Sequence, residues 1–341
     1  MMKKAILITS IIIVFIIAVN FIFANNVTKT DTVISKIEFK GMNLVALIKK
    51  LKNNTLEELK LFDVNYISLI PYAFVNQEKA TVSFNSERQW WGEKTEGLKV
   101  CIDRTHQKQM FVMLKPHLWI SHNIYSGDLD FETENEWKKW ENDYENYILS
   151  MATIDQDKKI ALFCIGTELN KSIEKRPQYW TSLIKKIRAI YSGKLTYAAN
   201  WDDFEKVPFW NQLDYIGIDA YFPLSTNETP SINELKLAWK QPIDKMDLLY
   251  KKIKKPILFT EFGYRNSNEC AKEPWKEDNK TQNNQGQVNA YEALFSELSK
   301  KSWFKGGFAW KWYADDYYKT QGKIDYTPQG KPALDVIKKW Y

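Results

Sequence analysis

The chain has 341 residues, of which 44% are hydrophobic and 26% charged, so it is long enough to bury a large core. Its formal net charge is +6, and the basic residues are scattered, which argues against a nucleic-acid-binding surface. The composition does not shift along the chain, so we expect one folded domain rather than two.

The amino terminus has the pattern of an export segment. Two lysines, at positions 3 and 4, precede about twenty mostly apolar residues that end at Ala24. The length of this stretch favours an uncleaved membrane anchor, whereas its position favours a signal peptide. With residues 1–24 in either role and 25–33 as a polar tether, the folded domain would span 34–341. We expect the protein to be secreted, or attached to the outer face of the membrane through residues 5–24.

Strand-like and helix-like segments alternate through the rest of the chain. Eight short runs rich in apolar and β-branched residues predict strands at 37–43, 64–71, 110–115, 160–165, 195–199, 215–221, 257–260 and 306–312. Strands that alternate with helices form parallel sheets, and eight such units are the number that closes a barrel. The sequence therefore predicts an α/β fold with a single (β/α)₈ TIM barrel.

The predicted helices between these strands show capping signals and apolar periodicity. Thr55–Glu58 and Thr133–Glu136 have the form of capping boxes. The second box precedes an aromatic stripe at helical spacing, which we expect to pack against the barrel rather than bind a sugar: Trp137, Trp140, Tyr144, Tyr147 and Met151. Similar periodicity predicts helices over 180–191 and 288–298, and Pro332 should begin a terminal helix.

Two glutamates occupy equivalent places after predicted buried strands. Glu261 directly follows the run 257–260, and Glu168 follows the run 160–165 after one glycine and one threonine. Either glutamate alone could be an ion-paired residue at the rim of the core. However, the two lie 93 residues apart, about three βα units of roughly 30 residues, so both should face the carboxyl-terminal mouth of one barrel. Two carboxyl groups that flank one bond are the equipment of glycoside hydrolysis.

The other predicted strand ends add polar and aromatic groups, which indicates a ligand-binding mouth. Candidate substrate-binding residues are Asn43, His117, Trp119, Thr167, Asn200, Trp201, Tyr221, Arg265, Trp310 and Trp312. Trp310 and Trp312 are two positions apart, so they should share one face of the last strand, and we expect at least one to stack on a sugar ring.

Neither cysteine nor histidine spacing indicates a disulfide framework or a metal site. The three cysteines are widely separated, and Cys164 falls within a predicted buried strand, where it should act as a small hydrophobic residue. The three histidines lack ligand spacing such as HExxH. We therefore expect no catalytic metal and no cofactor.

Six segments in order resemble glycoside hydrolase family 113: CIGTELN, YAANWD, IDAYFPL, ILFTEFGYR, GGFAWKWYAD and YTPQGKPALDVI. This is a clan A barrel family known for endo-β-1,4-mannanase activity, and the resemblance spans roughly 34–341. It implies Glu168 as the acid/base and Glu261 as the nucleophile. It also implies that Tyr221 hydrogen-bonds the nucleophile.

The sequence departs from the clan pattern directly before the acid/base glutamate. In the clan this residue is usually an asparagine whose amide binds the sugar 2-hydroxyl, whereas this chain has Thr167. The Thr167 hydroxyl or the Asn200 amide is a candidate for the same contact.

We therefore expect a monomeric, exported, retaining glycosidase that acts on β-1,4-mannan or manno-oligosaccharides. Two alternatives remain open: a hydrolase of another β-1,4-glycan, such as glucan or xylan, and a catalytically silent barrel that binds glycan at the cell surface. Both glutamates stand in intact strand-end contexts, which argues against the silent barrel.

Overall fold

The computed structural model describes residues 37–50, 56–278, 280–314 and 323–341. The predicted export segment, the tether after it, and Thr55 of the first predicted capping box lie outside the described residues. Within the described ranges, no helix combines the length and the apolar character needed to cross a membrane.

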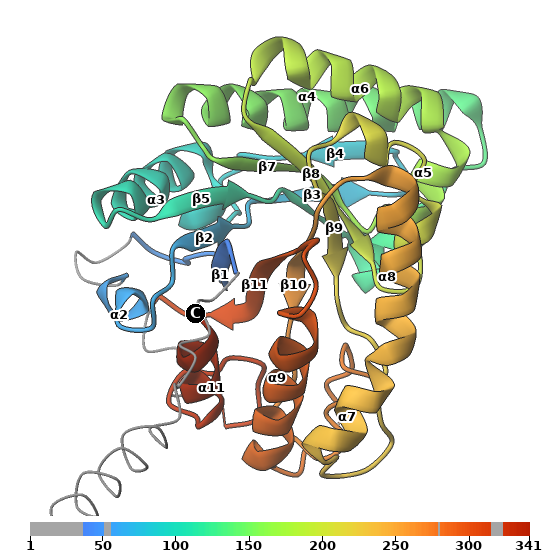
Figure 1. Cartoon of the computed structure of the whole chain (residues 1–341). Coiled ribbons are helices and arrows are strands. Elements are labelled where there is room, and N and C mark those ends of the chain that lie inside the picture. Colours follow the sequence, from blue (N-terminus) through green and yellow to red (C-terminus); the bar gives the residue numbers. More distant parts are fainter. Residues whose placement is uncertain (1–36, 51–55, 279, 315–322) are drawn as a thin grey trace, which may run out of the picture. The chain divides into compact units, whose positions relative to one another are not determined.

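The eight predicted strands close into one parallel barrel (Figure 1). Their observed bounds are β1 (Phe39–Leu44), β2 (Tyr66–Leu69), β5 (Phe111–Leu114), β7 (Leu162–Thr167), β8 (Lys194–Asn200), β9 (Ile216–Asp219), β10 (Ile257–Phe262) and β11 (Phe304–Trp312). The ring closes because β1 pairs in parallel with both β2 and β11. The prediction of a (β/α)₈ barrel is confirmed.

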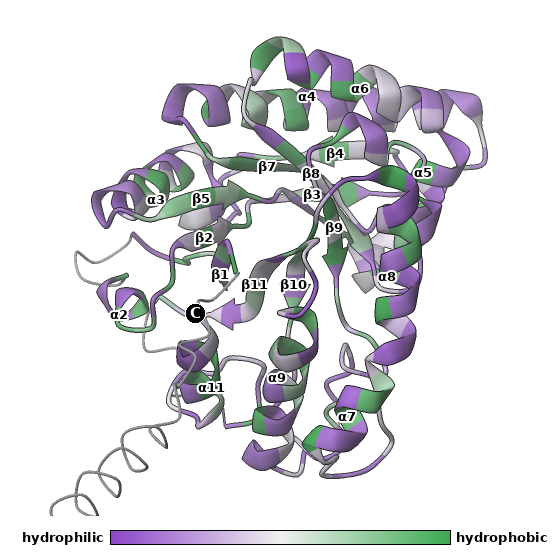
Figure 2. Cartoon of the chain, viewed as in Figure 1, coloured by the Kyte–Doolittle hydropathy of each residue, from purple (hydrophilic) through white to green (hydrophobic). Residues whose placement is uncertain are grey.

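Helices surround the barrel and connect its strands. They are α2 (Glu57–Lys60), α3 (Thr95–Gln107), α4 (Glu134–Lys158), α5 (Asn170–Lys175), α6 (Pro177–Ile190), α7 (Ile232–Ala238), α8 (Lys240–Ile253), α9 (Asn284–Leu298) and α11 (Ala333–Trp340). In Figure 2, β7 and β9 are largely hydrophobic, whereas α4 and α8 show hydrophilic outer sides. This is the arrangement expected when amphipathic helices cover a buried parallel sheet.

Helix α4 shows how local sequence determines one of these elements. Its start is the predicted capping box, because Thr133 Oγ1 accepts the Glu136 N–H at 3.2 Å and Glu136 Oε2 accepts the Thr133 N–H at 2.9 Å. The aromatic stripe is buried, with Trp140 stacked on Tyr144 at a centroid distance of 4.9 Å. The stripe is therefore core, as predicted.

The interior of the barrel changes from apolar to polar toward its mouth. A small buried cluster fills the lower part: Phe39, Met113, Leu162, Leu258 and Phe308. Side chains two positions apart on a strand point the same way, so Lys115, directly after β5, and Thr260, on β10, occupy the next inward layer. Gly41 leaves room for the cluster, because a Cβ there would lie 2.4 Å from the Phe308 ring.

A second, three-stranded sheet lies beyond the ends of β2 and β5. Strand β3 (Tyr72–Asn76) pairs in parallel with β6 (His117–Ile120) and antiparallel with β4 (Thr81–Ser83). Pro71 separates β2 from β3, and Pro116 separates β5 from β6. Proline has no N–H to donate, so the barrel ladder stops there and the chain continues into a new sheet. The sequence analysis missed this sheet.

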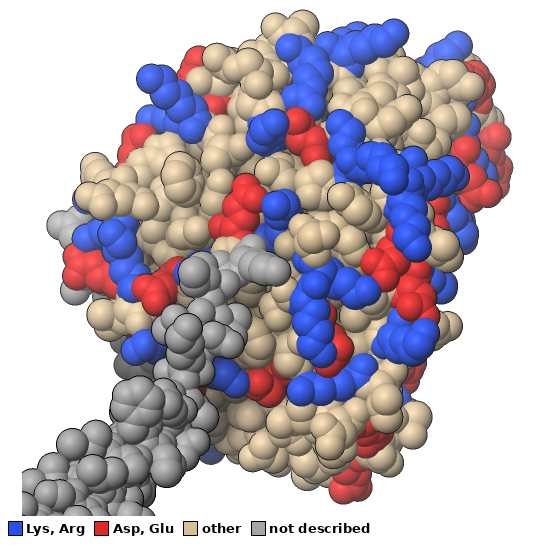
Figure 3. Space-filling model, in the orientation of Figure 1, with Lys and Arg blue, Asp and Glu red and all other residues tan. Residues whose placement is uncertain are grey.

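Acidic and basic residues are intermingled on the surface shown in Figure 3. Ion pairs between helices include Lys186–Glu145 at 2.7 Å, and an ion pair between a helix and a loop is Arg188–Asp214 at 2.6 Å. Basic residues adjoin one another over the upper right of this face, with acidic residues at their edges.

Candidate active site

A cavity of about 650 Å³ opens at the carboxyl-terminal mouth of the barrel and contains both glutamates. Its lining is Tyr72, His117, Tyr125, Ser126, Thr167, Glu168, Asn200, Trp201, Asp202, Asp219, Tyr221, Glu261, Trp275 and Trp310. The strand ends thus bring Glu168, Glu261 and six of the ten candidate substrate-binding residues together at one cavity.

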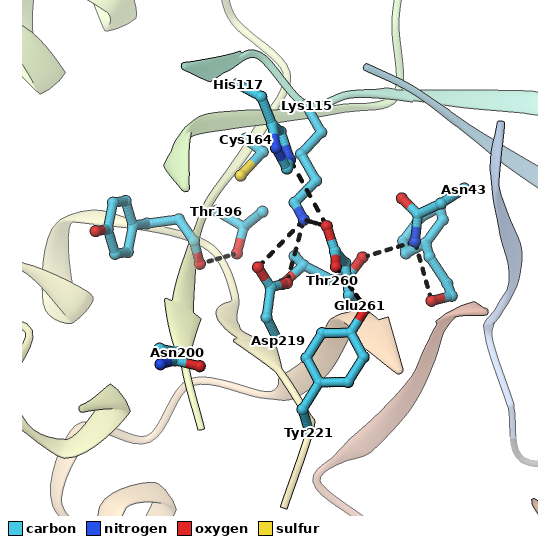
Figure 4. A network of polar contacts seen from close by, with 12 residues as sticks. Asn43, Lys115, His117, Cys164, Thr196, Asn200, Asp219, Tyr221, Thr260 and Glu261 are labelled. Carbon is cyan, nitrogen blue, oxygen red and sulfur yellow. Dashed lines mark hydrogen bonds and ion pairs between the residues drawn. The ribbon is translucent and has the colours of Figure 1, made fainter. Parts of the chain in front are cut away.

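Glu261, on β10, is held by two fixed donors (Figure 4). Lys115 Nζ donates to Oε1 at 2.5 Å, and the Tyr221 hydroxyl donates to Oε2 at 2.7 Å. Tyr221 follows β9, the neighbour of β10, whereas Lys115 follows β5 on the opposite side of the barrel, so the carboxylate is held from two directions. The exposed fraction of the Glu261 residue is 6%, which leaves little room for water to replace either partner.

Lys115 is a fully buried cation between two carboxylates. Its Nζ donates to both oxygens of Asp219, at 3.2 and 3.3 Å, in addition to Glu261. Burial opposes the charge on the ammonium, but Asp219 and Glu261 outweigh burial and raise the pKa of Lys115. A buried charge is tolerated only with such partners, so the three side chains form one unit.

Asp219, on β9, is the second carboxylate of this unit. Its Oδ1 also accepts the Thr260 hydroxyl at 2.7 Å. Burial raises the pKa of Asp219 to about 7; Lys115 acts in the opposite direction, and the negative charge of Glu261 adds to the rise. Asp219 is thus tied to Lys115, Thr260 and Glu261 by charge as well as by hydrogen bonds.

Glu168 lies directly after β7 with its backbone in the left-handed region, at φ 51°. Its N–H donates to the Ala198 carbonyl at 2.8 Å, which holds this conformation. A non-glycine residue there costs on the order of 1–3 kcal/mol, and such strain is concentrated at functional sites.

The pKa of Glu168 is raised well above its ordinary value. Burial is the largest cause, and the negative charges of Asp219 and then Glu261 add to it. The charge of Lys115 and a hydrogen bond from the Tyr125 hydroxyl act in the opposite direction. The Glu168 carboxyl is thus kept protonated to higher pH than an ordinary glutamate, as a proton donor requires.

His117 supplies a neutral ring at the floor of the cavity. Its Nε2 lies 3.7 Å from Glu261 Oε1, too far for a hydrogen bond. Burial, followed by the positive charge of Lys115, lowers the pKa of His117 well below its ordinary value. The imidazole can therefore meet a ligand as a neutral donor or acceptor without changing the charge of the site.

Thr167 and Asn200 line the same cavity as Glu168. Asn200 Oδ1 accepts the backbone N–H of Trp201 at 2.9 Å. The side-chain NH₂ group of Asn200 is therefore the part of this amide that can donate a hydrogen bond to a ligand. Both candidates for the 2-hydroxyl contact are therefore placed within the cavity, next to the end of β7 or β8.

Aromatic rings form two walls of the cavity. Trp201 and Trp275 stack on each other, with centroids 5.2 Å apart and planes at 17°. Tyr326 anchors the loop that carries Trp275, because its hydroxyl donates to the Pro274 carbonyl at 2.6 Å. Trp310, on β11, forms a second wall.

The expectation that Trp310 and Trp312 share a face is wrong. Strand β1 pairs Met42 with Ala309 but Leu44 with Trp312, so β11 contains one extra residue at this point. Such a bulge interrupts the alternation of side chains. Trp310 lines the cavity, whereas Trp312 is buried against Phe62 in the core and is not placed to bind substrate.

Asn43 and Arg265 also lie away from the cavity lining. Asn43 is fully buried, and its NH₂ group donates to the carbonyls of Thr260 and Phe308 at 3.2 and 3.1 Å, which ties β1 to the neighbouring strands. Arg265 follows the end of β10 and lies beneath a loop, where it donates to the Ile324 carbonyl at 3.2 Å. Both expectations of substrate contact are corrected to structural roles.

Sequence reasoning gave no role to several residues that the structure places in the site. Lys115 and Asp219 were visible as charged groups at strand ends, but their pairing spans 104 residues. Tyr125 and Trp275 come from loops, where their only signal was an aromatic residue in a polar segment. In the described part of the chain, no group of three or more His, Cys, Asp or Glu could hold a metal ion, and all three cysteines are buried and free.

A closed parallel barrel with glutamates at the carboxyl ends of its fourth and seventh strands, both lining one cavity, defines the class of barrel glycoside hydrolases. The sequence model of Glycoside Hydrolase Family 113 matches residues 47–331, and the chain belongs to this family.

Solved structures agree with this assignment. The GH113 β-mannanase AaManA from Alicyclobacillus acidocaldarius has 21% identity and a TM-score of 0.77, over 89% of this chain and 96% of that one. A GH113 β-1,4-mannanase has 25% identity and a TM-score of 0.77, over 89% and 99%. The β-glucuronidase from Ruminococcus gnavus shares only the fold, with 14% identity and a TM-score of 0.62, over 89% of this chain and 50% of that one. A search of curated proteins found no match.

Replacing Lys115 should destabilise the fold, because it would leave two buried carboxylates without their cation. We expect Lys115→Met to lower the free energy of unfolding by about 3–5 kcal/mol at neutral pH, measured by urea denaturation. The double variant Lys115→Met/Asp219→Asn should recover part of this loss. Lys240→Met, which removes an exposed ion pair with Asp244, is the control and should have far less effect. Equal losses in the two single variants would contradict the buried unit.

Proposed function

We propose that the protein is a retaining glycoside hydrolase that cleaves β-1,4-mannosidic bonds in mannan or manno-oligosaccharides. The observation that carries the proposal is the contrast between the two glutamates of one cavity. Glu261 accepts hydrogen bonds from the Lys115 ammonium and the Tyr221 hydroxyl, whereas burial and neighbouring negative charges raise the pKa of Glu168. Two carboxyl groups in opposed environments are the arrangement that separates a nucleophile from a proton donor.

In the first step, Glu168 gives its proton to the glycosidic oxygen as the bond to the anomeric carbon breaks. Glu261 attacks that carbon from the opposite side and forms a glycosyl ester. In the second step, Glu168, now a carboxylate, takes a proton from water, and the water oxygen displaces Glu261. Two inversions give net retention.

The charge of Glu261 couples the two steps. The negative charge of Glu261 helps to raise the pKa of Glu168 in the free enzyme. Esterification removes that charge, so the pKa of Glu168 falls at the stage where this residue must act as a base. Lys115 is not left unpaired in the ester, because Asp219 still accepts its hydrogen bonds.

The choice of mannan is supported by the family and by the two similar structures described as β-mannanases. Mannose has an axial 2-hydroxyl, and Thr167 and Asn200 are the groups proposed to meet it. The test is the release of reducing sugar from mannan, glucan and xylan by the purified protein. Preferential release from mannan is expected, and preference for glucan or xylan would replace the substrate. Binding without release would indicate a silent barrel.

Asp219 should set the alkaline limit of activity. Activity requires protonated Glu168, so the rate is lost as the pH rises through the pKa of Glu168. After burial, the negative charge of Asp219 is the largest cause that raises that pKa. We therefore expect Asp219→Asn to move the alkaline limb of the kcat/KM profile to lower pH. The control Asp247→Asn, at an aspartate paired with Lys301, should leave the limb in place. A limb that stays put in both variants, or moves to higher pH in Asp219→Asn, would contradict this role.

A further inference from the structure

The barrel has a second end, opposite the catalytic mouth. In a (β/α)₈ barrel the helices run back from the mouth, so each helix ends near the start of the next strand. We call this end the amino-terminal face. It is formed by the segments that lead into the eight strands: 37–40, 60–65, 108–110, 157–161, 188–194, 213–215, 251–256 and 299–305.

The amino-terminal face is strongly basic, although the chain as a whole is not. Its segments contain fourteen lysines and arginines against four aspartates and glutamates. The net charge of the whole chain is only +6, so the residues outside this face are together acidic. Basic residues that are scattered along the sequence are thus gathered by the fold at one end of the barrel, which gives this end a positive field.

The densest group of basic residues lies at the end of α8. Lys251 and Lys252 are in the last turn of the helix, and Lys254 and Lys255 follow it. Among the described residues, no carboxylate forms an ion pair with any of these four lysines, whereas Lys301 pairs with Asp247 at 2.7 Å. The adjoining basic residues of Figure 3 lie over the part of the molecule where Figure 1 places this end of α8.

Two of the basic residues occupy a backbone conformation that usually belongs to glycine. Lys159 and Lys254 end α4 and α8 in the left-handed region, at φ 54° and 60°. Glycine is common at this position because a Cβ is unfavourable there. The helix dipole attracts cations to helix ends. It does not account for the exposed aromatic surface that the basic residues surround.

The strand starts lie inside the ring of helix ends, and their side chains are aromatic. Phe111, the first residue of β5, is 54% exposed. Its ring stacks on Tyr66 at a centroid distance of 5.1 Å, and the rings of Tyr66 and Tyr215 lie 4.8 and 5.2 Å from Phe39. By contrast, Trp119, which is 44% exposed, lies at the mouth end, where it lines a cavity next to the catalytic one. An exposed ring surrounded by lysines suits the boundary between lipid headgroups and acyl chains.

The amino-terminal part of the chain joins the barrel at the same face. The described chain begins at Ile37 and enters the barrel with Phe39, the first residue of β1. The predicted export segment is therefore attached to this end of the barrel and not to the mouth. Stable attachment to a membrane usually combines an apolar segment with a basic patch, and here the two would act at one end of the molecule.

We propose that the amino-terminal face docks on the surface of a bilayer that contains anionic phospholipid. The lysines meet the headgroup phosphates, and Phe111 enters the headgroup layer. The catalytic mouth then points away from the membrane, where a polymer can reach it. Each basic residue near the surface adds to the attraction, and salt weakens it. The docking does not depend on which reaction the protein catalyses.

Vesicle sedimentation tests the docking. The closed barrel and its core lie within residues 37–341, so residues 25–341 can be used without the predicted export segment. At about 0.1 M salt we expect vesicles of equimolar phosphatidylcholine and phosphatidylglycerol to bind at least tenfold more tightly than pure phosphatidylcholine vesicles. The preference should disappear at about 1 M salt, where charges are screened within a few ångströms. Equal affinity for the two vesicles at low salt would overturn the proposal.

Charge reversal locates the docking surface. We expect Lys252→Glu/Lys254→Glu to weaken binding to the anionic vesicles at least tenfold. The matched control is Lys138→Glu/Lys240→Glu, which makes the same change of charge at two exposed lysines near the starts of α4 and α8, at the mouth end. It should change the affinity less than twofold. Thermal unfolding checks that both variants are folded, and equal weakening in the two variants would contradict docking through the amino-terminal face.

Phe111 distinguishes a bilayer from a soluble polyanion. Phe111→Ser should weaken binding to the anionic vesicles about tenfold, because burial of the ring in the headgroup layer is lost. Phe111→Leu should keep most of the affinity. Binding to soluble polyphosphate should be the same in wild type and Phe111→Ser, because a polyanion in water offers no apolar layer. Unchanged vesicle affinity in Phe111→Ser would mean that the face binds polyanions in general, and the proposal would be wrong.

The full chain tests the orientation. All three cysteines are buried, so one introduced cysteine can carry a dye whose emission shifts to the blue in an apolar environment. In vesicles of the equimolar mixture, we expect a blue shift for the dye at Ser192→Cys, in the segment before β8, and none at Lys138→Cys, near the mouth. In pure phosphatidylcholine, neither dye should shift. A shift at Lys138→Cys, or the absence of a shift at Ser192→Cys in the anionic vesicles, would overturn the proposed orientation.

Discussion

Glu261→Ala should abolish turnover of the natural glycan, and added azide should restore a reaction whose product has the inverted anomeric configuration. Without its carboxylate, the enzyme cannot form the glycosyl ester, and loss of a nucleophile costs on the order of 10⁴-fold or more in kcat. The shortened side chain leaves space beside Lys115 and Tyr221, the two groups that held the carboxylate. Azide can enter this space and attack the anomeric carbon once, while Glu168 still protonates the leaving oxygen.

Proton NMR of the glycosyl azide measures the configuration. Glu205→Ala, at an exposed glutamate outside the cavity that pairs with Lys245, is the control and should keep the wild-type rate. Thermal unfolding shows whether Glu261→Ala is folded with Lys115 paired to Asp219 alone. A product of retained configuration would mean that Glu261 is not the nucleophile. Net inversion by the unmodified enzyme would remove the two-step mechanism.

The sequence predicts the barrel and its two glutamates well, because both depend on local features. The runs at β7 and β10 are apolar for the length of one strand and end in a carboxylate, and a parallel arrangement sends both ends to the same mouth. The spacing of about three βα units then places both glutamates at the mouth of the same barrel. None of these inferences requires a particular contact between distant side chains.

What the sequence could not predict depends on register and on long-range pairing. The small sheet arises because Pro71 and Pro116 end two ladders at the same level, although each segment alone resembles one longer strand. The burial of Trp312 follows from a bulge of a single residue in β11, which periodicity cannot locate. The Lys115–Glu261 pair joins residues 146 positions apart, so neither residue indicates the other.

Glu168→Ala should have the opposite dependence on the leaving group. A natural sugar leaving group needs the proton of Glu168, so its cleavage should slow by about 10²–10⁴-fold, the usual contribution of a general acid. An activated phenolate, such as dinitrophenolate, leaves without a proton. We therefore expect formation of the glycosyl ester from a dinitrophenyl glycoside to stay near the wild-type rate, visible as a burst of phenolate. Hydrolysis of the ester should then limit turnover, because no base takes the proton from water.

Azide should relieve that second step in Glu168→Ala and give a product of retained configuration. Azide needs no general base, and it attacks an ester that is still held on Glu261, so two inversions occur. The configuration of the azide product is thus opposite in the two alanine variants, and this difference separates the roles by stereochemistry as well as by rate.

The alkaline limb of the kcat/KM profile on natural glycan should also disappear in Glu168→Ala, because the raised pKa of Glu168 is its source. If Glu168→Ala gives inverted azide product and Glu261→Ala gives retained product, the two assignments must be exchanged. If formation of the glycosyl ester from the dinitrophenyl glycoside slows as much in Glu168→Ala as cleavage of the natural glycan, Glu168 is not the proton donor.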